Sequence, residues 1–186
     1  MARRRTLTDR LLEQSTHEYS LRTRFVALLL LAPIFLFVLP CLFVRLGAEL
    51  DQRMQCSPVL SPPSNLFVGF LLILPSLLLG LWANHSQFTA GRGTPVPLMA
   101  TQALIVQPPY TYSRNPMALG AVGMYLGVAL LFRSIGAVIL VLIFAAALLT
   151  YIRLCEEREM AARFGPEYQA YKRRTPFLIP RVRMRR

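Results

Sequence analysis

Two clusters of polar side chains flank a pair of apolar segments in the second half of the chain. The first cluster occupies residues 110–120 and contains aromatic, cationic and amide groups, and the second contains the adjacent carboxylates of Glu156 and Glu157. Such groups are costly beside lipid, so at the ends of membrane helices they indicate functional positions. A helical hairpin between the clusters would bring them together. We therefore interpret them as two parts of one binding site.

The composition places the chain in a membrane. It has 186 residues, of which 54% are hydrophobic and 16% charged, and this is more apolar than an ordinary soluble domain. The net charge of +12 fits the gathering of Lys and Arg on the cytoplasmic side of membrane proteins. Nucleic-acid binding is not expected, because no soluble basic face is evident. Cys41, Cys56 and Cys155 have no metal-binding spacing, so we expect neither a metal site nor a structural disulfide.

Four apolar segments predict the fold class. They occupy residues 25–44, 66–83, 117–132 and 135–152. Roughly 20 residues cross a bilayer core as a helix, so the first two segments are long enough and the last two are near the short limit. Only Arg133 and Ser134 separate the last two, which predicts a tight antiparallel hairpin. We expect an all-α protein, an integral membrane helical bundle of about four transmembrane helices with a C-terminal amphipathic helix.

The amphipathic helix is predicted for residues 153–173. An apolar stripe runs along this segment, is interrupted at Gly165-Pro166, and is typical of a basic helix that lies on the membrane surface. Glu159 and Arg163 stand four residues apart, a favourable ion-pair spacing. We interpret its aromatic residues, Phe164, Tyr168 and Tyr171, as packing residues.

Basic residues set the expected orientation. The segments before the first span and after the last are rich in Arg, whereas the loop at 45–65 is not, so the positive-inside rule predicts that both termini are cytoplasmic. The Gly- and Pro-rich loop at 84–116 would then share the cytoplasmic face with the tail. The basic residues are almost all Arg, which suggests a bacterial inner membrane. We divide the single membrane domain, 1–186, into a basic arm (1–24), two spans (25–83) and a cofactor-binding half (84–180).

Several short motifs follow one another across residues 85–180. They are Gly91-Arg-Gly-Thr-Pro95, Tyr110-x-Tyr-x-Arg-Asn-Pro-Met-x-x-Gly120, Glu156-Glu157, Phe164-Gly165, Tyr168 and Tyr171. In order and spacing this series resembles the isoprenylcysteine carboxyl methyltransferase and phospholipid methyltransferase superfamily. Members of that superfamily are integral membrane enzymes that bind S-adenosylmethionine at the cytoplasmic end of the last two spans and methylate lipid-like acceptors. The resemblance implies the same activity and cofactor here, with a membrane lipid or lipid-like molecule as the partner.

The resemblance also implies a set of site residues. The family's Arg-His-Pro-x-Tyr cofactor motif falls on residues 114–118, with Asn115 in place of His and Ala118 in place of Tyr. The acceptor-binding Arg of the family falls on Ile152 in strict register and on Arg153 one residue later, so Arg153 is the candidate. The implied cofactor-binding residues are Gln102, Ala103, Leu104, Ile105, Tyr110, Arg114, Asn115, Pro116, Met117, Ala118, Gly120 and Glu156.

The chemistry of S-adenosylmethionine suits these residue types. Carboxylates can pair with its ammonium or ribose hydroxyls, and aromatic faces can hold its sulfonium or adenine. Methyl transfer is an in-line displacement, and positioning supplies much of its rate without a metal. An acidic acceptor would need a cation to hold it, whereas a neutral amine or thiol would benefit from a base.

The sequence leaves alternatives open. Arg114 could anchor a helix at the membrane interface, Gly120 could serve close helix packing, and the carboxylates at 156–157 could form a solvated face paired with Arg153 and Arg158. Two function classes follow: methyl transfer to a carboxylate, amine or thiol acceptor, or a non-catalytic membrane protein that retains the methyltransferase fold. A small transporter has less support, because no charged residue is predicted at mid-bilayer in an internal repeat.

Overall fold

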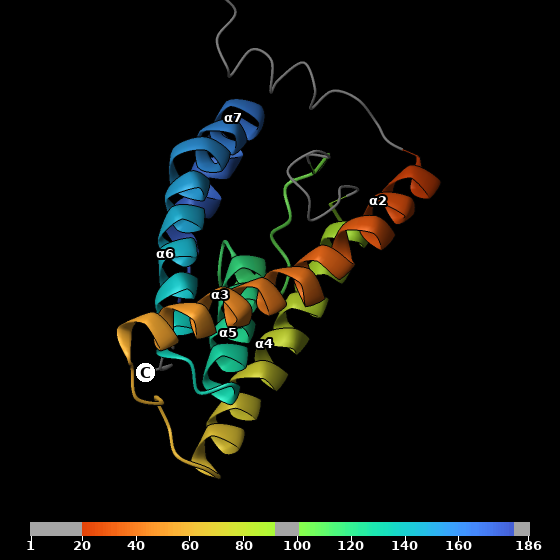
Figure 1. The fold of residues 1–186 in the computed structure, drawn as a ribbon. Coiled ribbons are helices and arrows are strands. Elements are labelled where there is room, and N and C mark those ends of the chain that lie inside the picture. The colour runs from red at the N-terminus through yellow and green to blue at the C-terminus, as the bar shows by residue number, and fades with distance from the viewer. Residues whose placement is uncertain (1–19, 92–100, 181–186) are drawn as a thin grey trace, which may run out of the picture.

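The elements of this protein are helices, and no strand occurs in the part of the chain that the structure describes. The structure is a computed structural model in which residues 20–91 and 101–180 are described. The elements, with two π-helical segments written η, are α2 (Leu21–Pro33), η1 (Ile34–Val38), α3 (Leu39–Met54), α4 (Ser64–Thr89), α5 (Pro116–Leu131), α6 (Ile135–Tyr151), η2 (Ile152–Glu156) and α7 (Glu157–Arg174). Figure 1 shows their arrangement, which confirms the predicted all-α class.

Within residues 20–91 and 101–180, three continuous helices are long and apolar enough to cross a membrane. They are Arg22–Met54 (33 residues), Ser64–Thr89 (26 residues) and Ile135–Arg174 (40 residues). The apolar helix α5 is shorter, and at 1.5 Å per residue its 16 residues reach only about 24 Å, less than the ~30 Å of a bilayer core. About four spans were predicted, and the described part of the chain has three full-length candidates and one short apolar helix.

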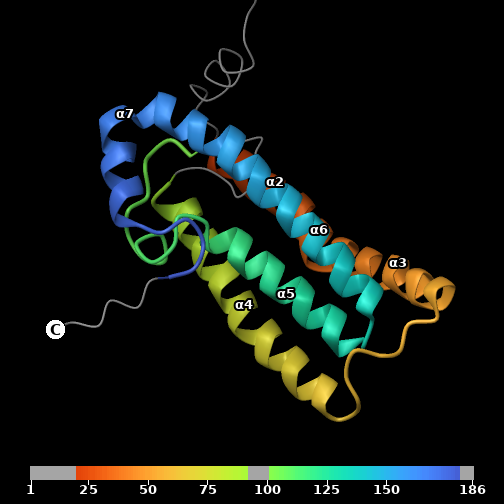
Figure 2. The ribbon, with the colours of Figure 1, turned by 90° about the vertical axis from the view of Figure 1, so that its left-hand side faces the viewer.

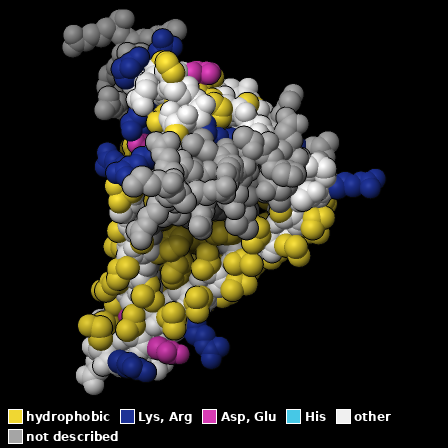
Figure 3. Space-filling model, turned by 90° about the horizontal axis from the view of Figure 1, so that it is seen from above, with side chains coloured by type: hydrophobic (Ala, Val, Ile, Leu, Met, Phe, Trp, Pro, Cys, Tyr) yellow, Lys and Arg dark blue, Asp and Glu magenta, His cyan; other side chains and the backbone are white. Residues whose placement is uncertain are grey.

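Apolar side chains cover the outside of the bundle. Leu30, Phe67 and Leu78 are each about two-thirds exposed or more, at 66%, 72% and 67%. Figure 3, which views the molecule from above, shows hydrophobic side chains along its flanks and Lys and Arg side chains at its periphery. Exposed apolar surface of this extent on helices of membrane length is the surface of an integral membrane protein.

Glycine residues let α5 pack closely against α4, and the two helices lie side by side in Figures 1 and 2. A Cβ atom on Gly120 would lie 2.7 Å from the carbonyl oxygen of Ser76, and one on Gly127 would lie 2.9 Å from that of Gly69. Neither contact is possible for a larger residue without a shift of the backbone. The small residues of α5 therefore bring the two backbones together, as in other membrane helix pairs.

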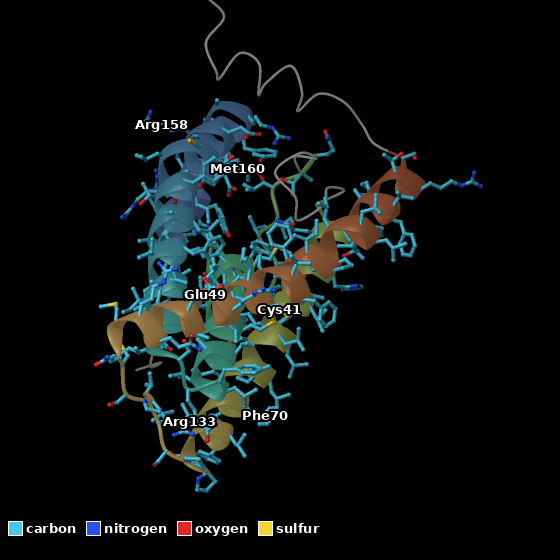
Figure 4. All side chains as sticks on the ribbon, viewed as in Figure 1. Cys41, Glu49, Phe70, Arg133, Arg158 and Met160 are labelled. Atoms are coloured by element: carbon cyan, nitrogen blue, oxygen red, sulfur yellow. The ribbon has the colours of Figure 1, made fainter. Side chains whose placement is uncertain are left out.

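The predicted tight turn joins α5 to α6. Arg133 adopts a left-handed conformation with φ 62°, and its Nε donates to the carbonyl oxygen of Leu60 at 2.8 Å. Ser134 caps α6, because its hydroxyl accepts a hydrogen bond from the backbone N–H of Ala137 at 2.9 Å. The hairpin returns the chain to the end of the bundle where α5 began, and Figure 4 shows Arg133 and Arg158 at opposite ends of the molecule.

The last helix is bent at the position that the sequence indicated. Gly165 has φ 48° and ψ −125°, a conformation that glycine adopts without the steric cost of a Cβ atom. Figure 2 shows α7 turning back on itself there, so that its second half lies beside the loop that precedes α5. The bend places the chain after α7 against the beginning of α5.

Candidate functional site

One cavity joins the polar clusters to the interior of the bundle. Its volume is about 420 Å³, and residues from α2, α4, α5, α6 and α7 line it. Pockets for small ligands commonly have ~300–1,000 Å³. Polar side chains gather at the end next to the loop that precedes α5, and they include Arg114, Asn115, Glu156, Glu159 and Arg163. The cavity therefore has the size and the polar groups of a ligand site.

The other end of the cavity is apolar. Leu28, Leu31 and Phe35, from α2 and η1, face Leu77 of α4 and Tyr125 of α5 there. The Tyr125 hydroxyl donates to the carbonyl oxygen of Phe35 at 2.8 Å and so joins two of these walls. We call this part the apolar limb. It lies between apolar helices, two of which are of membrane length, and suits a hydrocarbon chain.

Most of the residues that the resemblance implied line this cavity. They are Leu104, Ile105, Tyr110, Arg114, Asn115, Pro116, Met117, Ala118, Gly120 and Glu156. Gln102 and Ala103 do not line it, and their backbone N–H groups donate to the carbonyl oxygen of Gly91 at 2.7 and 3.4 Å. The structure thus brings both polar clusters to one place although 41 positions separate Asn115 and Glu156 in the sequence.

Arg153 lies outside the cavity. Its side chain is exposed, and its guanidinium carbon lies 5.1 Å from the ring centroid of Phe177, within cation–π range. The neighbouring Ile152, which strict register favoured, is buried and lines the cavity. The structure therefore does not bring the predicted acceptor-binding Arg to the ligand site.

Glu157 forms the ionic core of the site. Its carboxylate makes an ion pair with Arg114, and a second one with Lys172 at 2.6 Å between Nζ and Oε2. If the carboxylates at 156–157 formed a solvated face, Glu157 would pair with Arg153 or Arg158. Its partners are instead Arg114 and Lys172. Because the side chains of Arg114 and Glu157 are both largely buried, the pair fixes the loop before α5 onto the first turn of α7.

The segment after α7 holds the same loop through its backbone. The Arg114 backbone N–H donates to the carbonyl oxygen of Pro176 at 2.9 Å, and its Nε donates to that of Thr175 at 3.1 Å. The Nδ2 of Asn115 donates to the carbonyl oxygen of Phe177 at 2.8 Å. Asn115, which replaces the family's His, therefore tethers the tail while it lines the cavity.

Tyrosine residues supply aromatic walls. Tyr110, Tyr151, Tyr168 and Tyr171 line the cavity, and the Tyr171 hydroxyl donates to the carbonyl oxygen of Tyr110 at 2.7 Å. Tyr168 and Tyr171, interpreted from the sequence as packing residues, thus also face the ligand space. Ala118, which replaces a family Tyr, lines the cavity without a ring.

Polar groups at the polar end include some without a partner among the described residues. The buried Asn84 Oδ1 has no hydrogen bond there, whereas the Tyr110 hydroxyl and the Gln87 amide lie within interaction range of each other. The Glu156 carboxylate makes no ion pair in the described chain, whereas Glu159 pairs with Arg163 at 3.2 Å. Burial, followed by the nearby Tyr171, raises the pKa of Tyr110, so its hydroxyl stays protonated and able to donate. These groups can receive a polar ligand.

The π-helical segment η2 carries Glu156. This wider turn interrupts the regular α-helical hydrogen bonds of the backbone between α6 and α7. Both Ile152 and Glu156 belong to it and line the cavity. Single π-helical turns within α-helices are rare and often mark functional positions. Met160, one turn later, points toward the cavity while Arg158 points away (Figure 4).

Sequence reasoning missed the polar face of α4. Ser76, Gly80, Asn84 and Gln87 line the cavity and recur at spacings of four, four and three, which places them on one helical face. Polar residues at such spacing within an apolar span are a signal in themselves. From the sequence, residues 66–83 were predicted only as an apolar membrane span, so this signal was not used.

The comparison with protein families agrees with this geometry. The family model described as phospholipid methyltransferase matches residues 64–167, more than half of the 186-residue chain. No curated protein and no solved structure gives a significant match. The matched range begins with α4, continues through the α5–α6 hairpin and ends within α7, so it includes both polar clusters. This chain therefore belongs to the phospholipid methyltransferase family.

Proposed function

We propose that this protein transfers a methyl group from S-adenosylmethionine to the headgroup of a membrane lipid at the cytoplasmic edge of the membrane. Family membership implies methyl-transfer activity at a membrane in general. The observation that carries the finer proposal is a single cavity with a polar end and an apolar limb. Such a cavity can hold a polar methyl donor and a lipid chain at the same time.

The residues at the polar end fit S-adenosylmethionine. Its ammonium and ribose hydroxyls need acceptors, and the carboxylate of Glu156, which has no ion-pair partner among the described residues, offers them. Its adenine needs apolar and aromatic walls, which Ile105, Tyr110 and Met117 offer on one side of the cavity. When bound, S-adenosylmethionine supplies an electrophilic methyl group on a sulfonium.

The protein's own groups would then orient the reactants. Arg114, held by Glu157 and the tail carbonyls, keeps the loop before α5 in place rather than offering a free charge. The Tyr110 hydroxyl donates, and the Glu156 carboxylate accepts. Because α7 and the segment after it pack against the loop before α5, they would limit the water around the reacting groups, which would strengthen each electrostatic contact. Positioning of this kind is what an in-line transfer requires.

The acceptor would enter from the lipid side. A chain in the apolar limb remains among apolar side chains, so only its headgroup leaves a membrane-like environment. Both termini and the polar end of the cavity would face the cytoplasm, as the distribution of Arg predicts. In a bacterial cell this orientation would place the site at the inner surface of the inner membrane.

A transfer assay tests this function. The purified protein in mixed detergent–phospholipid micelles is incubated with S-adenosylmethionine that carries a labelled methyl group, and the lipid extract is separated and counted. We expect label in a phospholipid fraction. Binding of S-adenosylmethionine without transfer to any lipid would instead favour a non-catalytic protein that retains the fold, for which the missing ring at Ala118 is the motivating observation.

A further inference from the structure

Arg24 is a buried cation near the beginning of α2. The residue is only 5% exposed, and its guanidinium carbon lies 4.8 Å from the ring centroid of Phe88, where α2 crosses the C-terminal part of α4 (Figure 1). Its Nη1 donates to the carbonyl oxygen of Phe88 at 3.4 Å, which is long for a hydrogen bond. Arg side chains near the end of a membrane helix normally extend into water, so the burial of this one calls for an explanation.

No carboxylate balances this charge within the described residues. The segments on both sides of the contact, 20–48 and 64–91, contain no Asp or Glu, and the ion pairs of the described chain involve other cations. The buried Nε of Arg24 also has no hydrogen-bond partner there. A buried donor without an acceptor is unfavourable, and more so when the group is charged. Together these observations indicate an anionic ligand at this position.

Arg24 continues the side of α2 that faces the cavity. Leu28, Leu31 and Phe35 line the cavity, and they follow Arg24 at spacings of four, three and four residues, which places all four on one helical face. Gln87, near the end of α4, lines the cavity as well. Arg24 itself is not one of the lining residues, so it lies at the rim, about 6 Å along the helix axis from the first lining residue of α2.

The contact with Phe88 leaves one edge of the Arg24 guanidinium available. The hydrogen bond uses Nη1, and the edge formed by Nε and Nη2 makes no hydrogen bond to the described residues. Two parallel N–H groups on such an edge match two oxygens of a phosphate group, which is why Arg is favoured for phosphate binding. The partial positive charge at the N-terminal end of α2 attracts the same kind of ligand.

We propose that Arg24 binds the phosphate of the acceptor lipid at the cytoplasmic rim of the apolar limb. This inference rests on the proposed function and deepens it. A lipid whose chain lies along Leu28, Leu31 and Phe35 would bring its phosphate to the first turns of α2, while the rest of its headgroup reaches the polar end. The family model begins at residue 64, so this subsite lies in a part of the chain that the family match does not include.

A cation–π contact alone accounts for Arg24 less well. Such contacts also form at exposed sites, and this one leaves the Nε donor buried without an acceptor. A phosphate supplies both the missing counter-charge and the missing acceptor oxygens. The two explanations predict different results. A contact between α2 and α4 stabilises the protein without lipid, whereas a phosphate subsite changes the response of the protein to lipids that contain phosphate.

The experiment compares Arg24→Gln and Arg24→Lys with the wild type. The matched control is Arg22→Gln, which removes an exposed charge two residues away on the same helix. Thermal unfolding in detergent is recorded with three probes, which are phosphatidylethanolamine, a diacylglycerol with the same chains but no phosphate, and inorganic phosphate. The KM and kcat of methyl transfer to phosphatidylethanolamine are measured in the same micelles.

We expect phosphatidylethanolamine to raise the melting temperature of the wild type and of Arg22→Gln more than the diacylglycerol does, because a ligand that binds the folded state stabilises it. Arg24→Gln should lose this difference between the two lipids. Its KM for phosphatidylethanolamine should rise about ten- to a hundredfold through loss of a charged hydrogen bond, with kcat changed by less than about threefold. Arg24→Lys keeps the charge but not the paired N–H groups, so its KM should be intermediate.

Three results would overturn the proposal. Inorganic phosphate that stabilises the wild type as much as phosphatidylethanolamine does would assign Arg24 to a soluble anion. An unchanged difference between the two lipids in the Arg24 variants would leave only a contact between α2 and α4. A difference that is lost while the KM stays constant would assign the phosphate to a lipid that is not the acceptor.

Failure of the proposed function gives a different result. A wild-type protein that methylates no lipid would remove that function, whereas the comparison of melting temperatures would still show whether Arg24 binds a lipid phosphate. If Arg24→Gln does not fold, Arg24→Lys supplies the same comparison, because it retains the positive charge beside Phe88.

Discussion

Arg114 and Glu157, separated by 43 positions in the sequence, form a buried ion pair that joins the loop before α5 to the first turn of α7. Their side chains are only 10% and 7% exposed. The α5–α6 hairpin makes this meeting possible, because it returns the chain to the end of the bundle where α5 begins. The pair then locks together the two clusters from which the cavity is built.

Removal of the Glu157 carboxylate should destabilise the protein. Glu157→Gln leaves the guanidinium of Arg114 buried without its counter-ion, and breaking a buried pair in this way typically costs about 3–5 kcal/mol. The second ion pair of Glu157, with the more exposed Lys172, contributes little to this loss of stability. Thermal unfolding in detergent, followed by circular dichroism, measures the loss. Glu167→Gln, at an exposed position of the same helix, should leave the melting temperature unchanged, and equal melting temperatures for both variants would contradict the role of the pair.

Gly120 and Gly80 should respond oppositely to alanine. A Cβ atom at Gly120 would lie 2.7 Å from the Ser76 carbonyl oxygen and must push α4 and α5 apart, whereas one at Gly80 meets nothing within 4 Å. Gly120→Ala should therefore cost about 1–3 kcal/mol through overpacking. Gly80→Ala should be neutral or stabilising by up to about 1 kcal/mol, since alanine favours helix.

Denaturant or thermal unfolding of the two variants, measured in the same detergent, tests this contrast. A stable Gly120→Ala variant would show that the α4–α5 backbones are farther apart than described. A wider separation of the two helices would also mean that more space is available between them for a ligand.

Replacement of Arg153 should have little effect on the acceptor. The side chain stacks on Phe177 outside the cavity, and an exposed cation–π contact contributes only ~0.5–1 kcal/mol. Arg153→Ala should therefore change the KM of the lipid acceptor by less than about fivefold, as should the control Arg158→Ala. A much larger rise for Arg153→Ala alone would restore the acceptor-binding role that the superfamily resemblance implied.

The orientation of the bundle is open to a labelling experiment. Cys41, Cys56 and Cys155 are free, so a variant with Cys41→Ala and Cys155→Ala leaves Cys56 as the single native thiol. In intact cells, a membrane-impermeant maleimide should label Cys56, in the loop after α3. It should not label a cysteine placed at Pro180 in a cysteine-free background. Labelling of both from the outside would contradict cytoplasmic termini.

Local patterns in the sequence predicted the elements well. Runs of apolar residues marked the membrane helices, and Arg133-Ser134 between two such runs predicted the hairpin turn. Gly165-Pro166 predicted the bend in α7, because these residue types oppose a continuous helix. The meeting of Asn115 and Glu156 at one cavity followed from the hairpin alone. Each of these features depends on residue type and spacing within one or two neighbouring elements.

Contacts between distant segments were not predictable in this way. The partner of Glu157 depends on which side of η2 and α7 faces inward, and a helix-period argument that ignores the π-helical turn cannot give it. The backbone carbonyls of 175–177 hold Arg114 and Asn115, and backbone groups leave no trace in residue type. Asn84 and Gln87 were visible in the sequence as polar residues of an apolar span, but only the structure shows that both line the cavity.

The binding of S-adenosylmethionine tests the central claim most directly. Isothermal titration of the wild type, Glu156→Gln and Glu159→Gln in detergent compares a carboxylate that has no ion pair within the described residues with one already paired to Arg163. Loss of a charged hydrogen bond costs about 1.5–3 kcal/mol, so Glu156→Gln should weaken binding roughly ten- to a hundredfold. Glu159→Gln should cost under about 1 kcal/mol. No binding by the wild type, or equal losses in the two variants, would contradict a cofactor site at Glu156.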